Sequence, residues 1–407
     1  LLFVLALVTS AVISRILGPE GKGLYALAIL LPTLLITFSE LGVGAASVYQ
    51  IGQKKHPVKE IFGANIVFAA IVSSIALTLG FVLVTFFSER LFPNVAREYL
   101  YLSLIIVPLN VFLTFVADIL LGLKEFLKYN LSQVIRGFVF LFLVAILALT
   151  INFGVTAAIV SQIVSLAIAC IVLFVLAYRE TGGIIFNKNK ELYKDIFSYS
   201  TKDYLGTIAS YLHLRVDMWM VNIYLNPAAV GLYSISVALA EQIWIVSKSA
   251  GTALFPHIAS EKNEKKKSDF TPIVARNTLF ITTLMAFTLF VFGQWLIVLF
   301  YTEEFSGSVL PFQLLLVGAV AVSGMRILTN DIAGRGKPMI NTNIAAVALI
   351  LNVVLNIMLI PQYGIAGASL ATLTTYTLAF LVKVVVYCRI SKNKVTDVIF
   401  IKKSDLV

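Results

Sequence analysis

The sequence is poor in the residues from which most metal and catalytic sites are built. It contains only three histidines and two cysteines among its 407 residues. His56, His213 and His257 are too widely spaced for two of them to share a helical turn, and Cys170 and Cys388 offer neither a metal-ligand spacing nor a disulfide framework. A G-x-x-x-x-G-K-[ST] phosphate loop is also lacking, which excludes ATP hydrolysis by that route. The sequence therefore predicts no metal and no organic cofactor.

Charged residues are scarce as well, at 13% of the chain, whereas 59% of the residues are hydrophobic and the mean hydropathy is +0.94. A water-soluble protein of this length could not cover so apolar an interior, so the chain belongs in a bilayer. A membrane-spanning helix needs roughly 20 mostly apolar residues. Twelve stretches qualify, at about 1–17, 23–49, 61–87, 100–121, 134–150, 155–178, 204–225, 230–254, 277–300, 308–330, 342–359 and 365–387.

An internal repeat divides these stretches into six and six. Residues 17–28 (LGPEGKGLYALA) match residues 225–236 (LNPAAVGLYSIS), and residues 152–158 (NFGVTAA) match residues 362–368 (QYGIAGA). The offsets of 208 and 210 residues indicate a duplicated unit. Because six is even, both halves enter the membrane from the same side. We predict an all-α polytopic membrane protein whose twelve helices form two pseudo-symmetric six-helix bundles.

The predicted parts are an N-terminal bundle at 1–178, a cytoplasmic linker at 179–203, a C-terminal bundle at 204–387 and a basic cytoplasmic tail at 388–407. The linker ends in an amphipathic run, Leu192, Tyr193, Ile196 and Phe197, which we expect to lie on the membrane surface. The first apolar stretch starts without an initiator Met, so we expect further residues before it. No small-residue cleavage site precedes Arg15, which argues against a secretory signal.

Basic residues are distributed unequally between the predicted loops. The loops after even-numbered stretches, together with the tail, hold 23 of the 31 Lys and Arg residues, whereas the opposite loops and adjoining helix ends hold Arg15, Lys22, Arg90 and Arg97. Because Lys and Arg are enriched in cytoplasmic loops, we place the even loops and both termini in the cytoplasm, with the chain in the cell membrane. The same bias accounts for the net charge of +10, so no nucleic-acid partner is needed.

Ionisable residues inside the apolar stretches are informative, because a charge in hydrocarbon is costly and faces a cavity or a partner. The seventh stretch carries Arg215 and Asp217 near the midplane. Residues two apart on a helix point to nearly opposite faces, so at least one of them must address another helix. The eighth stretch carries Glu241, Trp244 and Lys248 on one face. The structural alternatives are an ion pair of Arg215 with an acid that fixes helix packing, and simple packing of Trp244.

Five residues share one depth in the predicted membrane. Glu40, Asp118, Lys248, Arg326 and Lys383 each lie about 18 residues from the extracytoplasmic end of their stretch, and Glu40 is the repeat counterpart of Lys248. This pattern predicts a mixed, partly cationic ring toward the inner leaflet. In the alternative interpretation, Arg326 and Lys383 snorkel to the cytoplasmic interface and Asp118 pairs near the following loop.

Several segments together resemble one known family. The segments are RILGPE at 15–20, GLY at 23–25, RVD at 215–217, GLYS at 231–234, NVVLN at 352–356 and IPQYGIAGA at 360–368. They are similar to motifs of the polysaccharide transporter family, which includes O-antigen and exopolysaccharide flippases. That family lies within the superfamily of multidrug and toxic-compound extrusion transporters and lipid II flippases. The resemblance implies two six-helix bundles around a central cavity, which move polyprenyl-diphosphate-linked oligosaccharide from the inner to the outer leaflet by alternating access.

The implied substrate has an anionic head, a polar glycan and a lipid tail, so its carrier needs cations. Arg binds phosphate by a bidentate fork and Lys binds it as a point charge. The candidate substrate-binding residues are Arg215, Lys248, Arg326, Lys383, Trp244, Tyr211 and Asn222. The candidates for a coupling ion, H⁺ or Na⁺, are Glu40, Asp118, Asp217 and Glu241. The expected partners are lipid-linked oligosaccharide, membrane lipid, and a glycan polymerase or other polysaccharide-assembly protein.

Two other functions are weighed against the flippase. An ion-coupled multidrug exporter of the same superfamily would favour acids over Arg and Lys at the substrate site, whereas the candidates here are mixed. A membrane-embedded glycan polymerase or ligase would need a long extracytoplasmic loop with clustered polar residues, but the longest such loop is about 88–99. The sequence therefore favours a transporter that is not an enzyme.

The predicted orientation can be tested with single cysteines. Cysteines placed at Asn187 and Asn263 should react with an impermeant thiol reagent only from the cytoplasm, and cysteines at Asn94 and Ser306 only from outside. Labelling from the opposite sides would reverse the orientation.

Overall fold

The computed structural model describes residues 1–150, 154–186, 189–200, 204–261 and 263–402, and all regular elements within these ranges are helices. Asn187, one of the labelling positions, lies outside the described residues. The chain forms two compact units. The N-terminal unit comprises Leu1–Ile208 with Asn226–Gly231, and the C-terminal unit comprises Ala209–Leu225 with Leu232–Val407.

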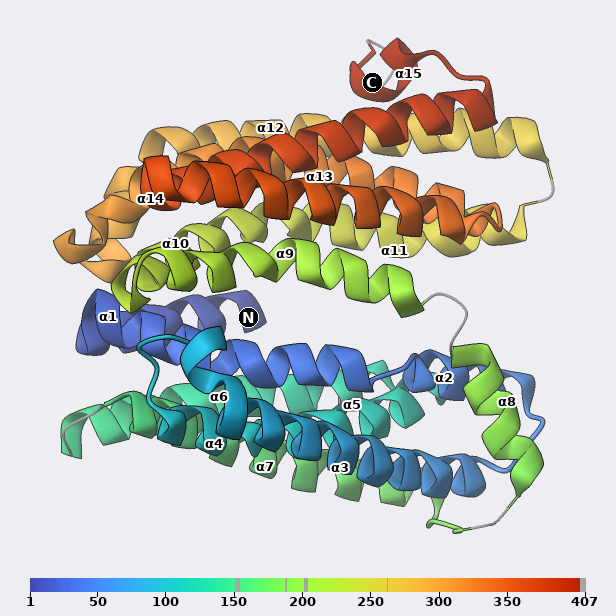
Figure 1. The fold of residues 1–407 in the computed structure, drawn as a ribbon. Coiled ribbons are helices and arrows are strands. Elements are labelled where there is room, and N and C mark those ends of the chain that lie inside the picture. Colours follow the sequence, from blue (N-terminus) through green and yellow to red (C-terminus); the bar gives the residue numbers. More distant parts are fainter. Residues whose placement is uncertain (151–153, 187–188, 201–203, 262, 403–407) are drawn as a thin grey trace. The chain divides into compact units, whose positions relative to one another are not determined.

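The helices of residues 1–200 form the body of the N-terminal unit (Figure 1). In chain order they are α1 (Leu2–Ser39), α2 (Val43–Gln53), α3 (Val58–Leu91), α4 (Arg97–Leu104), α5 (Ile106–Gly122), α6 (Phe126–Thr150), α7 (Val155–Thr181) and α8 (Lys190–Ser200).

The remaining helices form the C-terminal unit, apart from the first residues of α9 and the first turn of α10, which belong to the N-terminal unit. They are α9 (Tyr204–Tyr224), α10 (Pro227–Ala240), η1 (Glu241–Ile243), α11 (Trp244–Ser260), α12 (Glu264–Tyr301), η2 (Glu303–Ser308), α13 (Val309–Gly334), α14 (Pro338–Ser391) and α15 (Val395–Ile399).

The longest helix, α14, is a hairpin of two arms that meet at Gly364. The backbone there has φ 59° and ψ −139°, a conformation that essentially only glycine adopts. Asn352 Nδ2 lies 3.4 Å from Thr372 Oγ1, although 20 residues of straight helix would separate them by about 30 Å. Figure 1 shows the two arms side by side.

The first helix folds back in the same way. Gly18 has φ 64° and ψ −177° within α1, and beyond it the Lys22 ammonium reaches the Ser10 hydroxyl at 3.2 Å. Nine described helices or helix pairs are long and apolar enough to cross a membrane, and α1 and α14 are among them. Counting both arms of these two, and adding α9, gives the twelve predicted segments. The all-α architecture of two six-helix bundles is confirmed.

Three of the predicted segments are broken rather than continuous. The second breaks between α1 and α2, where Leu41 (φ 46°) and Gly42 (φ 74°) are left-handed. The fourth breaks after Leu104, because the ring of Pro108 clashes with the carbonyl four residues before it. The eighth is interrupted by the 3₁₀ turn η1, which begins at Glu241. Periodicity predicts the apolar stretches but does not reveal these local breaks.

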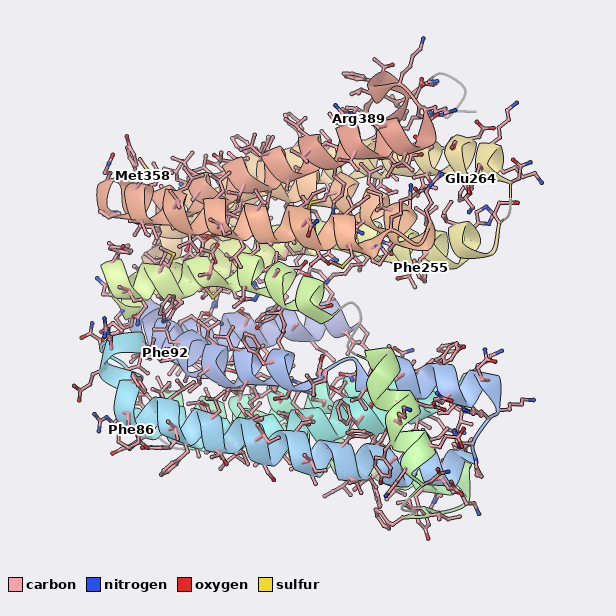
Figure 2. The ribbon with its side chains drawn as sticks, turned by 45° about the vertical axis from the view of Figure 1, so that its right-hand side comes forward. Phe86, Phe92, Phe255, Glu264, Met358 and Arg389 are labelled. Carbon is pink, nitrogen blue, oxygen red and sulfur yellow. The ribbon has the colours of Figure 1, made fainter. Side chains whose placement is uncertain are left out.

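The outward faces of the helices are strongly apolar, as a bilayer requires. Phe86 of α3 is 75% exposed, Phe255 of α11 43% and Met358 of α14 56% (Figure 2). Residues of this kind are normally buried in a soluble protein. Their exposure supports a multi-pass membrane protein.

The helix α8 corrects one expectation from the sequence. Leu192 and Ile196 do not face the membrane surface but are fully buried in the N-terminal unit, where α8 packs on α2. The ring of Tyr193 lies 5.4 Å from that of Phe68, and the side chain of Phe197 lies outside the described residues. Burial against protein satisfies the apolar face of α8, and the amphipathic pattern alone cannot distinguish this from lipid.

Ion pairs hold α8 at its polar face. Lys55, in the loop after α2, lies 2.6 Å from Asp195 and 3.0 Å from Glu191. The hydrogen bond to Lys55 lowers the pKa of the Asp195 carboxyl, and the bond to Asp195 raises the pKa of Lys55. These groups are solvent-exposed, so the ion pairs orient α8 more than they stabilise it.

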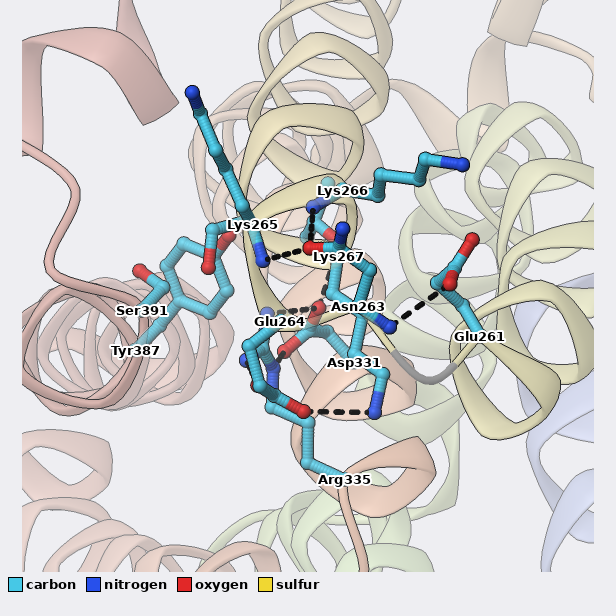
Figure 3. A network of polar contacts seen from close by, with 12 residues as sticks. Glu261, Asn263, Glu264, Lys265, Lys266, Lys267, Asp331, Arg335, Tyr387 and Ser391 are labelled. Carbon is cyan, nitrogen blue, oxygen red and sulfur yellow. Dashed lines mark hydrogen bonds and ion pairs between the residues drawn. The ribbon is translucent and has the colours of Figure 1, made fainter.

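A polar network closes one end of the C-terminal unit (Figure 3). Asp331, at the end of α13, is fully buried and pairs with Arg335 at 2.5 Å, while Thr271 of α12 donates to it at 2.6 Å. Arg335 also pairs with Glu264 at 2.7 Å, and Lys267 bonds to Glu264 at 2.9 Å. The network ties the start of α12 to the end of α13.

Single substitutions should show that the buried Asp331 contributes more to the stability of the protein than the exposed Glu264. Asp331→Ala should lower the stability of the purified protein by about 3 kcal/mol, because Arg335 loses a buried partner. Glu264→Gln is the control, since the Glu264 side chain is 68% exposed, and it should cost less than about 1 kcal/mol. Thermal unfolding in detergent would measure both, and equal effects would contradict the ranking.

Candidate functional site

Four of the candidate residues are basic and lie inside the apolar stretches of the sequence. All other Lys and Arg residues are assigned to loops, helix ends or the tail. The four are Arg215 on α9, Lys248 on α11, Arg326 on α13 and Lys383 on α14. All four belong to the C-terminal unit. The structure therefore supplies a set of cations within one compact body.

Arg215 is paired with Glu241. Its two terminal nitrogens donate to the two carboxylate oxygens at 2.7 and 3.2 Å, and the side chains are 25% and 22% exposed. A bidentate, charge-assisted pair of this kind is directional. As the spacing on α9 requires, Arg215 addresses another helix rather than Asp217. This geometry matches the structural alternative for Arg215, while one edge remains accessible to solvent.

Arg326 stacks on Trp244. The guanidinium carbon lies 4.8 Å from the centre of the indole ring, within the range of a cation–π contact. Trp244 is 3% exposed, and its indole N–H donates to the carbonyl of Ala319 at 3.1 Å. Tyr376 follows at 6.5 Å from Trp244, and His213 meets Tyr376 edge-on at 5.1 Å. Trp244 is thus a buried platform that orients Arg326.

A cavity of about 230 Å³, which we call the C-terminal cavity, lies between α9, α13 and α14. Arg326 and Lys383 line it, and no carboxylate is among its described lining residues. Within the described part of the chain, the Nε of Arg326 and the Oδ1 of Asn341 are buried in it without a hydrogen-bond partner. A cavity lined by two cations is suited to an anion.

Lys383 does not snorkel to the interface. It is 4% exposed, and its ammonium donates to Thr329 of α13 at 2.7 Å. Arg326 lies one turn before Thr329 on the same helix and lines the same cavity. Of the five residues of the predicted ring, Arg326 and Lys383 therefore line one cavity, and the other three do not line it.

Asp217 lies in a separate polar core. It is 2% exposed and accepts hydrogen bonds from the Tyr233 hydroxyl, from Thr372 at 3.0 Å and from the Met218 backbone N–H at 2.8 Å. Asn352 extends this core from the first arm of α14, since its amide lies 3.4 Å from Thr372. Two hydroxyl side chains and one backbone N–H therefore contact this buried carboxylate.

The sequence motifs contain residues of this core that the charge pattern missed. Tyr233 belongs to the GLYS segment, and Asn352 and Asn356 belong to the NVVLN segment. Asn356 donates to Asn352 at 2.9 Å, and its own Oδ1 is buried with no partner among the described residues. The motifs therefore mark this polar core, whereas a search for charges finds only Asp217.

The other candidates occupy different surroundings. Lys248 is exposed on α11, Tyr211 is half-buried one turn before Arg215, and Asn222 is buried further along α9. Glu40 and Asp118 belong to the N-terminal unit, at the break between α1 and α2 and near the end of α5. Asp118 lies so close to Gly44 that a Cβ there would be 1.9 Å from its Oδ2. Neither acid lines the C-terminal cavity.

Among the described residues, no three His, Cys, Asp or Glu side chains lie close enough together to hold a metal ion. The C-terminal unit offers two candidate sites, the cationic C-terminal cavity and the polar core around Asp217.

Comparisons with known proteins agree on family and fold. A family model described as "Polysaccharide biosynthesis protein" matches residues 1–262. A probable low-salt glycan biosynthesis flippase, Agl15 of Haloferax volcanii, is 25% identical over 194 residues, which is 45% of this chain and 39% of that protein.

Two solved structures share the fold over nearly the whole chain. An inward-facing multidrug resistance MATE family transporter has a TM-score of 0.79 at 15% identity, covering 96% of this chain and 95% of that one. The lipid II flippase MurJ, in an inward closed conformation, has a TM-score of 0.78 at 14% identity, covering 97% and 87%.

A double-mutant cycle would measure how far Arg215 and Glu241 stabilise the protein as a pair. Arg215→Met and Glu241→Leu should each destabilise the protein by about 3 kcal/mol, because each leaves a charge in a partly buried site. The double variant should lie within about 1 kcal/mol of the original protein. Thermal unfolding in detergent would measure the cycle, and additive losses would show that the pair does not act as a unit.

Proposed function

The chain belongs to the polysaccharide biosynthesis protein family, and we propose that it is a flippase for lipid-linked oligosaccharide. In this proposal it carries a polyprenyl-diphosphate-linked oligosaccharide from the inner to the outer leaflet of the cell membrane by alternating access, for cell-surface polysaccharide assembly. The proposal rests on the C-terminal cavity. Arg326 and Lys383 line this cavity, and no carboxylate is among its described lining residues.

The two cations suit a diphosphate by charge and by geometry. The Arg326 guanidinium, held flat by Trp244, presents its fork to phosphate oxygens, and the Lys383 ammonium adds a point charge. Lys248 and the Arg215–Glu241 pair would contact other parts of the head group, and Tyr211 the glycan. Trp244 and Asn222 are buried, and Trp244 would act through Arg326.

The depth of this cavity suits loading from the inner leaflet. Arg326 lies eight residues before the end of α13 at Gly334, and Lys383 lies eight residues before the end of α14 at Ser391. Both are therefore about 12 Å from helix ends that the charge bias assigns to the cytoplasm. A head group at this depth has left the interface but has not crossed the membrane.

The polar core around Asp217 is the proposed site of the coupling ion. A buried carboxylate beside the hydroxyl oxygens of Tyr233 and Thr372 can take a proton or Na⁺. An ion moves the conformational equilibrium only by its different affinity for the two states. The same core is the observation that favours the second candidate, an ion-coupled exporter of small molecules.

Transport in reconstituted vesicles tests the flippase. A polyprenyl-diphosphate oligosaccharide should cross only with the protein present, and Arg326→Gln and Lys383→Gln should each reduce the rate about tenfold or more, because a charge-assisted contact is lost. Arg97→Gln, on a 50% exposed side chain paired with Glu89, is the matched control and should transport normally. Asp217→Asn should still bind substrate but lose its response to an imposed proton or sodium gradient.

Two results would contradict this proposal. Undiminished transport by both cavity variants would remove the C-terminal cavity from the pathway. Efflux of a cationic dye that collapses with the gradient, without movement of the glycan lipid, would favour the exporter.

A further inference from the structure

A second cavity lies wholly within the N-terminal unit. It measures about 280 Å³ and lies between the two arms of α1 and the helix α6, and we call it the N-terminal cavity. Its polar lining includes Ser10, Gln133 and the cations Lys22 and Arg136, while Leu5 and Phe140 contribute to its apolar wall. No carboxylate is among its described lining residues. From the sequence, both cations belong to loops or helix ends, yet the fold places them in one cavity.

The Lys22 ammonium points into the unit rather than toward the nearest helix end. Lys22 is 8% exposed, and its Nζ donates to Ser10 at 3.2 Å and lies 5.8 Å from the ring of Tyr25. Lys22 is four residues from the bend at Gly18, or about 6 Å, whereas Ser10 is eight residues away, or about 12 Å. A snorkelling lysine would turn the other way. Lys22 therefore keeps its charge in the cavity at a cost in solvation.

Arg136 lies deeper and lacks a counter-charge. It is the tenth residue after Phe126, so it is about 15 Å along α6 from the start of that helix. No described residue forms a hydrogen bond or an ion pair with its guanidinium. Both cations line a cavity that no described acid lines, so a bound anion would offset the cost of holding their charges there.

We propose that the N-terminal cavity binds a phosphate ester that carries an alkyl chain. Arg136 would provide the fork, Lys22 the point charge, and Ser10 and Gln133 the neutral donors, while the apolar wall would take the first part of the chain. The phosphates of bilayer lipids lie at the interface, whereas Arg136 is about 15 Å along α6 from its first residue. The ligand is therefore a lipid phosphate in transit. This identification rests on the proposed flippase function, whereas the binding itself does not.

Binding of a defined probe to the full chain tests the inference. Tritiated geranylgeranyl phosphate would be titrated against the protein in phosphatidylcholine nanodiscs, in an Arg326→Gln/Lys383→Gln background that removes the charges of the C-terminal cavity. We expect one bound probe per chain. Lys22→Gln and Arg136→Gln should each weaken its binding about tenfold or more. Arg97→Gln, outside the cavity, should bind as the background does.

Conservative variants distinguish binding from folding. Lys22→Arg and Arg136→Lys keep the charge and should stay within about threefold of the background. Inorganic phosphate should compete only at far higher concentration, because it lacks the chain, and phosphatidylglycerol should compete poorly. Undiminished binding in both Gln variants would overturn the inference, and so would equal loss in the charge-conserving variants. Equal competition by phosphatidylglycerol would overturn the assignment to a lipid in transit.

The outcome is separable from that of the flippase test. If the probe binds in a Lys22- and Arg136-dependent way but the vesicles move no glycan lipid, the proposed function fails and this site stands. If the vesicles move glycan lipid and the probe ignores Lys22 and Arg136, the reverse holds.

Discussion

The cost of a charge in hydrocarbon governs the interior of both units. Most of the charged groups inside the two units contact a partner that offsets this cost. Arg215 has a bidentate carboxylate, Asp217 has three hydrogen-bond donors, and Arg326 has an aromatic face. Lys383 and Lys22 each have one hydroxyl, and Arg136 has no described partner. The least satisfied cations are those that line cavities, which is where a ligand would complete them.

The two halves of the repeat share the glycine and proline residues of their turns more closely than they share charged residues. Gly154 precedes α7 as Gly364 bends α14, and Pro19 follows the bend of α1 as Pro227 begins α10. The cations differ although the cavities correspond, since at the 208-residue offset Arg136 of the N-terminal cavity matches Ile344 of the C-terminal cavity. The turns are needed to fold each half, so both copies keep them. The cations of the two cavities are not part of these turns, so they can differ between the halves.

Much of the fold follows from the sequence because a membrane imposes few solutions. Apolar length predicts the segments, and the matched LGP and LNP motifs predict the duplication. The packing of α8 was predicted wrongly. An amphipathic sequence has the same pattern whether its apolar face is buried against protein or against lipid. The site was predicted in part. Arg326 and Lys383 share a cavity as their depth suggested, but Lys22 was assigned to a loop, because a linear pattern cannot show that α1 bends its ammonium inward.

The way in which the cations are held bears on how such a transporter would work. Trp244 orients Arg326, Thr329 holds Lys383 and Ser10 holds Lys22, and each of these contacts lies within one unit. A movement of one unit as a rigid body would leave these contacts unchanged. The intrinsic attraction of each cavity for an anion would then be nearly the same before and after the movement. A ligand that binds two conformational states with equal affinity does not change their populations. The direction of transport would therefore have to come from a separate bias, such as an ion at Asp217 or removal of the product, and the cavities would supply recognition alone.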